Sequence, residues 1–560
     1  MQANPSELSA RATAVAIDVR RLPGIKRLAA DYAYAFGTLA PFFAGDPTDR
    51  NAWADSIARV QSRQSQQSQQ GRCREVAAVI RAQQQRRGAP PAAIAAAERL
   101  ADPRTVAVLT GQQAGLFGGP LFTILKALTA LKLVDQVTRD HGVPATAVFW
   151  IEAEDHDWDE VRSCTVVDSE MATHTVSLPP RTGDPLPVAA VPVDGRIADV
   201  LTELEQILPP TEFRASLIAD LRAAYTPGIG MADAFGRWLE RVLGERGLVV
   251  YDASDPAAKP FVAELFSREL SSPGQTARLA AQAGADLVAR GFHTQVQAPG
   301  DSVDGVALFR IDANGRRPIQ SRNGDFVIND KPVASATLVK EAVERPVAFS
   351  PSVLLRPIVQ DTIFPTVCYV AGPNELAYLG QLRGIYERFG VPMPLMYQRA
   401  TATLVDSAAA RFLAKYNVPL DALHAQDDSA LNELLKTQIP EEVDEAFAGA
   451  ARATEEHMAR VIQALPALDP TLEGAARTTL TRMQKELETL QGKTIQAAKR
   501  RNETLRRQFT RTRALAFPNG HAQERTIAFV SFLNQYGSSL VERLWQELPL
   551  GLGQHWIVTI

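Results

Sequence analysis

An acidic segment with a histidine at its centre directly follows a strongly apolar stretch of the chain. The segment reads EAEDHDWDE at 152–160, and the apolar stretch reads ATAVFWI at 145–151. A histidine titrates near neutral pH and can transfer protons, whereas neighbouring carboxylates can orient it, bind a substrate ammonium or bind Mg²⁺. We therefore take His156, Asp155 and Asp157 as candidate catalytic residues. The alternative is an acidic run that forms ordinary solvated surface.

A glycine-rich loop offers a second candidate site. It reads GQQAGLFGG at 111–119, after the apolar run TVAVLT at 105–110 and before a helix expected over 121–140. A helix N-terminus carries about half a positive charge and unpaired N–H groups, so it suits a phosphate or a carboxylate. The loop is neither a Walker loop nor a GxGxxG fingerprint, so a tight strand-to-helix turn without a ligand is the alternative. The candidate residues for binding an anionic group are Gly111, Gln112, Gln113 and Gly115.

Two later apolar runs also end in residues with binding chemistry. TVCYVAGPNE at 366–375 ends in a Gly-Pro turn with Asn374 and Glu375, and MPLMYQR at 393–399 ends in Arg399. We expect these side chains to line the same pocket as the other segments. An ordinary helix N-cap, worth about 1 kcal/mol, is the alternative for Asn374 and Glu375.

The elements that must position these residues alternate in the order of an α/β fold. The run at 105–110, the glycine loop, the helix and the run at 145–151 form a βαβ unit, whose strands should be parallel. We expect a Rossmann-like parallel sheet, in which ligands bind beyond the carboxyl ends of the strands where the topology switches. Segments 111–119, 152–160 and 371–375 compete for that place because each follows an apolar strand.

Two β-rich inserts interrupt the expected core, and a helical arm follows it. The second insert contains the strand-like runs QVQAP (295–299), VALFRID (306–312) and FVIND (326–330). Apolar residues recur by fours and threes from Val443 to Leu465 and again from Leu480 to Ala497, which predicts an antiparallel α-helical coiled coil. The expected organisation is a core of 1–162, 210–290 and 346–415, a connective insert 163–209, a second insert 291–345, an arm 416–525, and a C-terminal helix in 526–560 that packs back on the core.

Composition excludes several classes of protein. The 560 residues carry a formal net charge of −4, which argues against a general nucleic-acid binder. The three cysteines form no CxxC or Cys/His metal spacing, which favours a reducing cytoplasm over a disulfide framework. The N-terminus lacks the pattern of a signal peptide, and no apolar run approaches the roughly 20 residues that span a bilayer. We expect a cytoplasmic protein without a membrane partner.

The same segments resemble one known family over almost the whole chain. The TGQQAGL and EDHD motifs are specific to that family, the BshC family, the cysteine-adding enzymes of bacillithiol biosynthesis. The segments that carry the resemblance are VLTGQQAGLFGGPLFTILKALTALKL (108–133), VFWIEAEDHDWDEV (148–161), SPSVLLRPIVQDTIFPTVCYVAGPNELAYLGQL (350–382), FGVPMPLMYQR (389–399), AAKRRNETLRRQ (497–508) and FPNGHAQER (517–525).

The resemblance implies a reaction, a fold and an assembly. The reaction is a ligation of L-cysteine to the amino group of glucosaminyl-malate, the last step of bacillithiol biosynthesis. The fold is a Rossmann-type core with connective-peptide inserts, similar to class I aminoacyl-tRNA synthetases, with a C-terminal coiled coil, and the assembly is a homodimer. A carboxylate forms no amide unaided in water, so ATP or ADP and Mg²⁺ are the expected cofactors, with no resident metal assigned. The chain has no HxGH or KMSKS-like element, so the likeness to synthetases does not extend to those motifs.

Two other functions stay open at this point. One is a non-catalytic nucleotide-binding or scaffold protein of the same thiol pathway, which would use the coiled coil to recruit a partner. The other is RNA binding through the basic run KRRNETLRRQFTRTR at 499–513, although a solvated helix face is the usual explanation for such a run. The acidic net charge makes RNA binding the least favoured of the three functions.

Overall fold

The computed structural model describes residues 14–68, 71–294, 305–312, 315–437 and 441–560. The chain divides into two compact units, which we call the core unit and the arm unit. The core unit comprises the residues up to 404 with 523–558 and 560, and the arm unit comprises 405–522 and 559. None of the helices in the described ranges is both long enough and apolar enough to cross a membrane.

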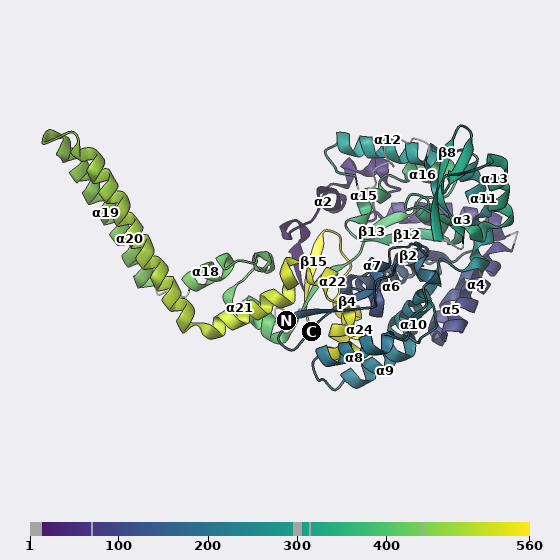
Figure 1. The fold of residues 1–560 in the computed structure, drawn as a ribbon, viewed down its shortest axis with the longest axis horizontal. Coiled ribbons are helices and arrows are strands. Elements are labelled where there is room, and N and C mark those ends of the chain that lie inside the picture. The colour runs from purple at the N-terminus through teal and green to yellow at the C-terminus, as the bar shows by residue number, and fades with distance from the viewer. Residues whose placement is uncertain (1–13, 69–70, 295–304, 313–314, 438–440) are drawn as a thin grey trace, which may run out of the picture. The chain divides into compact units, whose positions relative to one another are not determined.

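A five-stranded parallel sheet forms the centre of the core unit (Figure 1). Counted along the chain, its strands follow the Rossmann order 3-2-1-4-5, so the topology switches between β2 and β12. The predicted Rossmann-like parallel sheet is confirmed, and the carboxyl ends of β2 and β12 form its switch point. The strands lie in the order β6 (Val249–Asp252), β3 (Ala145–Glu152), β2 (Val106–Gln113), β12 (Thr366–Ala371) and β13 (Leu395–Gln398).

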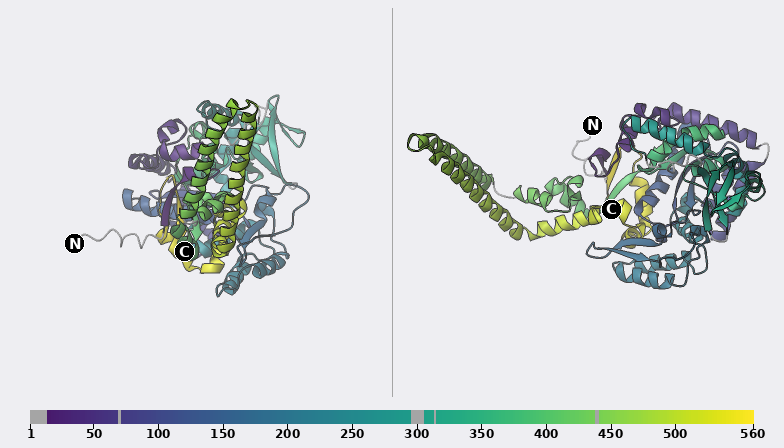
Figure 2. Two further views of the ribbon diagram at one scale, coloured as in Figure 1. Left: turned by 90° about the vertical axis from the view of Figure 1, so that its left-hand side faces the viewer. Right: turned by 45° about the horizontal axis from the view of Figure 1, so that its top comes forward.

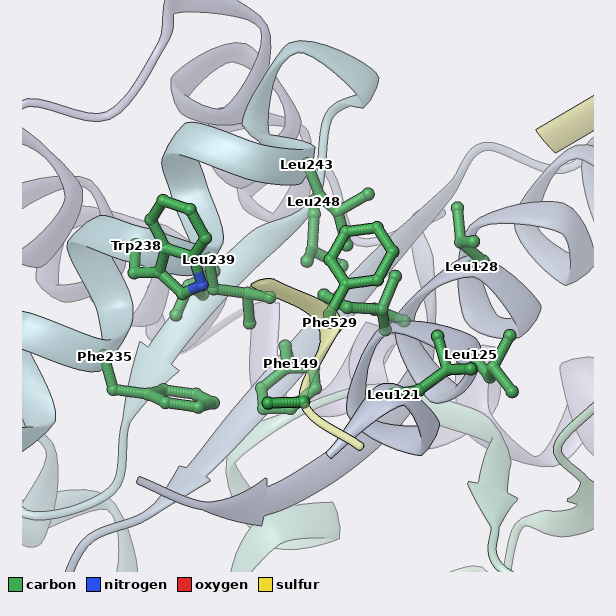
Figure 3. Packing of buried hydrophobic residues seen from close by; sticks show 14 of the residues in the cluster. Leu121, Leu125, Leu128, Phe149, Phe235, Trp238, Leu239, Leu243, Leu248 and Phe529 are labelled. Carbon is green, nitrogen blue, oxygen red and sulfur yellow. The ribbon is translucent and has the colours of Figure 1, made fainter. Parts of the chain in front are cut away.

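Helix α6 (Leu121–His141) packs on one face of this sheet. Figure 3 shows its Leu121 in one cluster with Phe149 of β3 and Trp238 of α10 (Met231–Leu243). Burying a leucine or phenylalanine side chain contributes about 1.5–3 kcal/mol, so this cluster fixes where α6 begins. The start of α6 is thereby held at the carboxyl end of β2.

The other face of the sheet contributes to a separate hydrophobic core because successive side chains of a strand point to opposite sides. Trp150 and Tyr251 pack there with ring centroids 5.1 Å apart, and Phe364 lies 5.0 Å from Tyr251. Helices α4 (Arg72–Arg87) and α5 (Pro91–Glu98) contribute to the same core. The sheet is therefore covered on both faces, as a parallel sheet requires.

Both predicted inserts contain β structure. The first holds the hairpin of β4 (Ser163–Val167) and β5 (Thr173–Ser177), followed by α8 (Ile197–Ile207). The second contributes four strands to an antiparallel sheet in the order β10-β9-β8-β7-β11, whose strand β11 lies beyond the predicted insert. The predicted run at 295–299 lies outside the described residues. The strands of the second sheet are β7 (Gly305–Asp312), β8 (Gly315–Arg322), β9 (Asp325–Ile328), β10 (Lys331–Val333) and β11 (Phe349–Pro351).

The end of the core unit differs from the single C-terminal helix that the sequence predicts. Three short helices occupy this region, and Gly537, with a φ of 69°, ends the second of them. A small sheet of β1 (Ala14–Asp18), β15 (Gln554–Thr559) and β14 (Thr401–Val405) was also not predicted. The short helices are α22 (Gln523–Thr526), α23 (Phe529–Tyr536) and α24 (Ser539–Glu547).

The arm unit contains the predicted antiparallel pair of long helices. Helices α19 (Glu441–Ala464) and α20 (Leu472–Arg501) run side by side in Figures 1 and 2 and are joined through the 3-10 helix η11 (Leu465–Ala467). Helix α21 (Glu503–Ala516) follows and ends before Pro518. The predicted coiled coil is confirmed, and its second helix ends at Arg501.

Candidate active site at the carboxyl edge of the parallel sheet

An ion pair between a buried lysine and a partly exposed glutamate lies at the switch point between β2 and β12. Lys126 comes from α6, and its Nζ lies 2.6 Å from Oε2 of Glu375, the first residue of α15 (Glu375–Leu379). The same Nζ donates to the carbonyl oxygen of Gly111 at 2.9 Å and to Oε1 of Gln112 at 3.2 Å. Burial lowers the pKa of Lys126; burial also raises the pKa of Glu375, but attraction to Lys126 outweighs this and leaves that pKa below its ordinary value. Glu375 is therefore held as a carboxylate.

A second group of polar side chains surrounds the end of β3. Trp150 Nε1 donates to Oε2 of Glu152 at 3.1 Å, and Nε of Arg356 lies 3.7 Å from the same oxygen. Arg356 is the first residue of α14 (Arg356–Ile363), and its Nη2 donates to the hydroxyl of Tyr378 at 3.2 Å. Burial raises the pKa of Glu152, and Arg356 opposes that shift. Glu152 thus combines a raised pKa with a position at the carboxyl edge.

The predicted catalytic residues occupy three different environments. Asp155 is fixed, because its Oδ2 accepts from Gln113 Nε2 at 3.0 Å and its Oδ1 lies 3.4 Å from Nδ1 of His156. His156 is exposed. Asp157 is the N-cap of α7 (Trp158–Val161) and accepts from the backbone N–H of Glu160 at 3.1 Å. Gln113 and Asp155, predicted from separate segments, are therefore brought together.

A pocket of about 410 Å³ opens beside the acidic segment. The first insert forms its other wall and is fastened there by the backbone N–H of Val188, which donates to the carbonyl of Asp155 at 2.7 Å. Across the described ranges, no three His, Cys, Asp or Glu side chains are grouped so that they could hold a metal ion. The residues that line the pocket are Asp155, His156, Asp157, Trp158, Asp159, Arg181, Gly183, Asp184, Pro185 and Leu186.

The second insert supplies an arginine that the sequence did not point to. Arg316 of β8 places its Nη1 3.4 Å from Oδ1 of Asp155 and 3.5 Å from Nδ1 of His156. Its guanidinium is held by Ser350 Oγ at 2.9 Å and stacks 3.8 Å above the ring of Phe309. The local sequence NGRRP resembles an ordinary turn, so its contact with the acidic segment depends on the tertiary fold.

The glycine-rich loop forms a tight turn whose amides are largely bonded within the chain. The N–H of Gly115 donates to Gln113 at 2.8 Å, the N–H of Gly118 donates to Gly115 at 3.0 Å, and the N–H of Gly119 donates to Leu116 at 3.1 Å. Gly118 has a φ of 93°, and a Cβ there would lie 2.7 Å from the indole nitrogen of Trp238. Anion binding at Gly111, Gln112, Gln113 and Gly115 stays a prediction, which would rest on the two glutamine side chains.

Asn374 and Arg399 differ in exposure. Asn374 is exposed and makes no side-chain cap hydrogen bond to α15, so the N-cap alternative is not observed for it. Arg399 is buried and binds Glu524 of α22 through two hydrogen bonds of 2.6 and 3.0 Å. Its guanidinium also lies 5.3 Å from the ring centre of Phe122. Substrate binding by Arg399 would require this ion pair to open.

Sequence reasoning missed Lys126, Glu152 and Arg316 as site residues. Lys126 interrupts the apolar run LFTILKALTAL, and a lone lysine among apolar residues of a buried helix was the available signal. Glu152 lay within the acidic segment but was not distinguished from its neighbours. Only the sheet order shows that Glu152, Lys126 and Glu375 share one edge.

Comparisons with known proteins agree with this architecture. The model of the BshC N-terminal Rossmann-like domain of bacillithiol biosynthesis matches residues 14–400, and that of the BshC C-terminal coiled-coil domain matches residues 402–560. The chain belongs to the BshC family. A relative from Salinibacter ruber, named "Putative cysteine ligase BshC", is 31% identical over 100% of both chains. Another of the same name from Symbiobacterium thermophilum is 35% identical over 85% of this chain and 88% of its own.

The BshC assignment covers the core unit and the arm unit together. Its Rossmann-like part contains every residue of the carboxyl-edge site, and its coiled-coil part contains α19 and α20. A third relative, from Koribacter versatilis, has the same printed name and is 31% identical over 94% of this chain and 96% of its own. The family resemblance expected from the TGQQAGL and EDHD motifs is confirmed.

Proposed function

We propose that this chain is a cytoplasmic ligase that joins the carboxyl group of L-cysteine to the amino group of glucosaminyl-malate, the last step of bacillithiol biosynthesis. The observation that carries the proposal is the similarity over the whole chain to relatives named as cysteine ligases of this family. The carboxyl-edge site supports it, because the site combines carboxylates, cations and a histidine at a Rossmann switch point.

Each part of the site has a task in such a reaction. The amide groups of Gln112 and Gln113 and the cation of Lys126 suit the carboxylates of a malyl group. His156 faces the pocket, where it can exchange a proton with the reacting groups, while Asp155 orients it. Asp157 positions the start of α7, and Arg316 holds the acidic segment against the second insert.

ATP and Mg²⁺ belong to the proposal because a carboxylate must be activated before it forms an amide. Bound ATP would supply that activation of the cysteine carboxyl group. The carboxylates of Asp155 and Asp157 are oxygen donors of the kind Mg²⁺ prefers. With no cluster of three metal-binding side chains in the described ranges, the ion would arrive on the nucleotide and keep several waters.

The test is a reconstitution with the purified full-length chain. L-cysteine, glucosaminyl-malate, ATP and Mg²⁺ are mixed, each is omitted in turn, and bacillithiol is followed by mass spectrometry. We expect product only in the complete mixture, and none when an N-acetylated glucosaminyl-malate replaces the free amine. Binding of glucosaminyl-malate without product in any mixture would overturn the ligase and favour a non-catalytic binding or scaffold protein.

The proposal includes a homodimer formed through the arm unit. Large apolar side chains are exposed on α19, α20 and the turn between them, and a coiled-coil hairpin can bury such residues against a second hairpin. A second copy of this chain is a suitable partner, because its hairpin presents the same apolar side chains and the two sets can bury each other. These residues are Val461, Leu468, Leu472, Met483 and Leu490.

A further inference from the structure

The proposed ligation requires a general base that takes a proton from the incoming amine. The structure limits which carboxylate can be that base. An amino group is protonated at moderate pH and is a nucleophile only after it loses that proton. Four carboxylates lie at or near the carboxyl edge of β2, β3 and β12, namely Glu152, Glu154, Asp155 and Glu375. A general base needs a carboxylate oxygen that the substrate can reach.

Glu375 is already engaged by its own neighbours. Its Oε2 binds Lys126 at 2.6 Å and accepts from the backbone N–H of Gly372 at 2.5 Å. Its Oε1 faces the hydroxyl of Tyr369 at 3.5 Å. The attraction to Lys126 also holds its pKa down, which makes Glu375 a weak base. Glu375 therefore anchors Lys126 and does not accept the proton.

Asp155 and Glu154 are occupied as well. Asp155 accepts from Gln113 on one oxygen and from the backbone N–H of His156 at 2.8 Å on the other. Glu154 is buried in an ion pair with Lys259, which also donates to the carbonyl of Phe349 at 3.2 Å. Both oxygens of Asp155 therefore already accept hydrogen bonds, and Glu154 is committed to its ion pair.

Glu152 is the exception among these carboxylates. Trp150 donates a hydrogen bond to Oε2 of Glu152, and Arg356 forms an ion pair with the same oxygen. Within the described part of the chain, Oε1 of Glu152 accepts no hydrogen bond. Its side chain is 21% exposed, against 25% for Glu375 and 32% for Asp155, so the unoccupied oxygen and not the exposure distinguishes Glu152. The contacts to Oε2 also fix the direction of the carboxylate, as a base that acts repeatedly on one substrate atom requires.

We infer that Glu152 is the general base that deprotonates the substrate ammonium, through its open Oε1. This inference rests on the proposed function. The ammonium proton passes to Glu152, and the neutral nitrogen attacks the acyl carbon of an activated cysteine. A C–N bond forms, the bond from that carbon to its leaving group breaks, and the electron pair departs with the leaving group. The second N–H proton is released to solvent.

The electrostatics of the site agree with this role. Burial raises the pKa of Glu152 above that of an ordinary glutamate, in spite of the nearby Arg356. A raised pKa makes a carboxylate a stronger base. Glu375, at the same edge of the sheet, is shifted in the opposite direction by Lys126. The two glutamates are thereby suited to different tasks, proton transfer and charge pairing.

The test compares Glu152→Gln with wild type in steady-state kinetics across pH. Glutamine keeps the shape and an acceptor for Trp150 but cannot take a proton, so kcat should fall about 100-fold or more. Wild-type kcat should decrease as pH falls through the raised pKa of Glu152, and this acidic limb should be missing in Glu152→Gln. Glu152→Asp should recover part of kcat and regain the limb. Glu160→Gln, an exposed change of equal charge in the same segment, is the matched control.

The outcomes separate this inference from the proposed function. A wild-type enzyme that makes no amide product overturns both. An active wild type with a Glu152→Gln variant that keeps the acidic limb, or keeps kcat within a few-fold, overturns the role of Glu152 alone. A structural role for Glu152 would lower kcat equally at every pH, so an unchanged profile shape with reduced kcat also overturns it. Thermal unfolding of each variant confirms that the compared proteins are folded.

Discussion

Two arginine–glutamate ion pairs, one in the core unit and one in the arm unit, have similar geometry and different surroundings. In the core unit, Arg399 Nη2 lies 2.6 Å from Oε1 of Glu524, and the two side chains are only 2% and 8% exposed. In the arm unit, Arg477 Nη2 lies 2.8 Å from Oε1 of Glu473, and the exposed fractions are 66% and 43%. The distances alone would suggest interactions of equal importance.

The difference in burial gives the two pairs different roles. An exposed pair is screened by water and contributes about 0–1 kcal/mol, whereas removing one partner of a buried pair leaves an unpaired charge and costs roughly 3–5 kcal/mol. The core unit therefore depends on each of its buried charges having its partner. The arm unit tolerates changes of charge. Because it exposes apolar side chains, we expect a second chain to bury them and so to stabilise the arm.

The largest expected effect follows from breaking the buried pair. Glu524→Gln leaves Arg399 charged and buried, and we expect the free energy of unfolding to fall by roughly 4 kcal/mol. The measurement is urea unfolding of wild type and variant followed by circular dichroism and tryptophan fluorescence. A variant as stable as wild type would show that burial does not distinguish the two pairs.

A buried histidine of the core unit should make stability depend on pH. Burial lowers the pKa of His555 to about 4, whereas an unfolded chain binds that proton below about pH 6.5. Because the unfolded state binds more protons in this window, stability decreases as pH falls from about 6.5 to 4, by on the order of 3 kcal/mol. Urea unfolding across this range should show a flatter pH dependence for His555→Gln. The exposed His457→Gln of the arm unit should retain the wild-type dependence.

Removing the exposed histidine of the site should affect catalysis and leave folding unchanged. For His156→Ala we expect kcat/KM to fall at least about 10-fold because a proton-transfer group is lost. The free energy of unfolding should change by less than about 0.5 kcal/mol, since the side chain is exposed. Product formation and urea unfolding are measured on the same preparation. Full activity would exclude His156 from the reaction.

Introducing a charge into the exposed apolar residues of the arm should weaken self-association. We expect Leu490→Asp to raise the dimer dissociation constant at least about 10-fold, because an aspartate would be buried in the interface. Sedimentation equilibrium over a range of concentrations gives the constant. The matched control is Glu486→Gln, a charge change on the same helix. A wild-type chain that stays monomeric at all concentrations would contradict the proposed homodimer.

The smallest effect is expected at the exposed ion pair of the arm unit, between Arg477 and Glu473. Glu473→Gln should change the free energy of unfolding by about 0.3 kcal/mol, and the change should vanish at high salt. Urea unfolding at low and high ionic strength checks this. A loss comparable to that of Glu524→Gln would mean that the arm residue is buried in the assembled protein.

The strands of the parallel sheet could be predicted because each is an apolar run followed by a turn. The βαβ pattern predicted that the strands are parallel, and it favoured the carboxyl ends of the strands as the place of the candidate segments. The strand order came from the structure. The three strands of the small sheet were missed because β1, β14 and β15 are joined only by long-range pairing. The C-terminal region was wrongly expected to form one helix, since non-helical backbone at Ala528 and at Gly537 divides it into three short helices.

The candidate site was predicted in part. The acidic segment and the glycine-rich loop do meet, through Gln113 and Asp155. Glu375 was placed correctly at the edge, but its partner Lys126 was not recognised. Arg316 comes from the second insert, and no local pattern distinguishes it from its neighbour Arg317. Contacts between segments far apart in the sequence produce no recognisable local pattern in either segment.

The amino-acid sequence alone determined the α/β class, the coiled-coil arm and the family, because hydrophobic periodicity and motifs are local properties that can be read within a few turns or strands. Only the tertiary structure decided which charges are buried and how they are paired. Arg399 and Glu524 are separated by 125 residues, yet each is tolerated in the interior only because the other is there. The free energy of a charge depends on its surroundings, and those surroundings exist only in the folded chain.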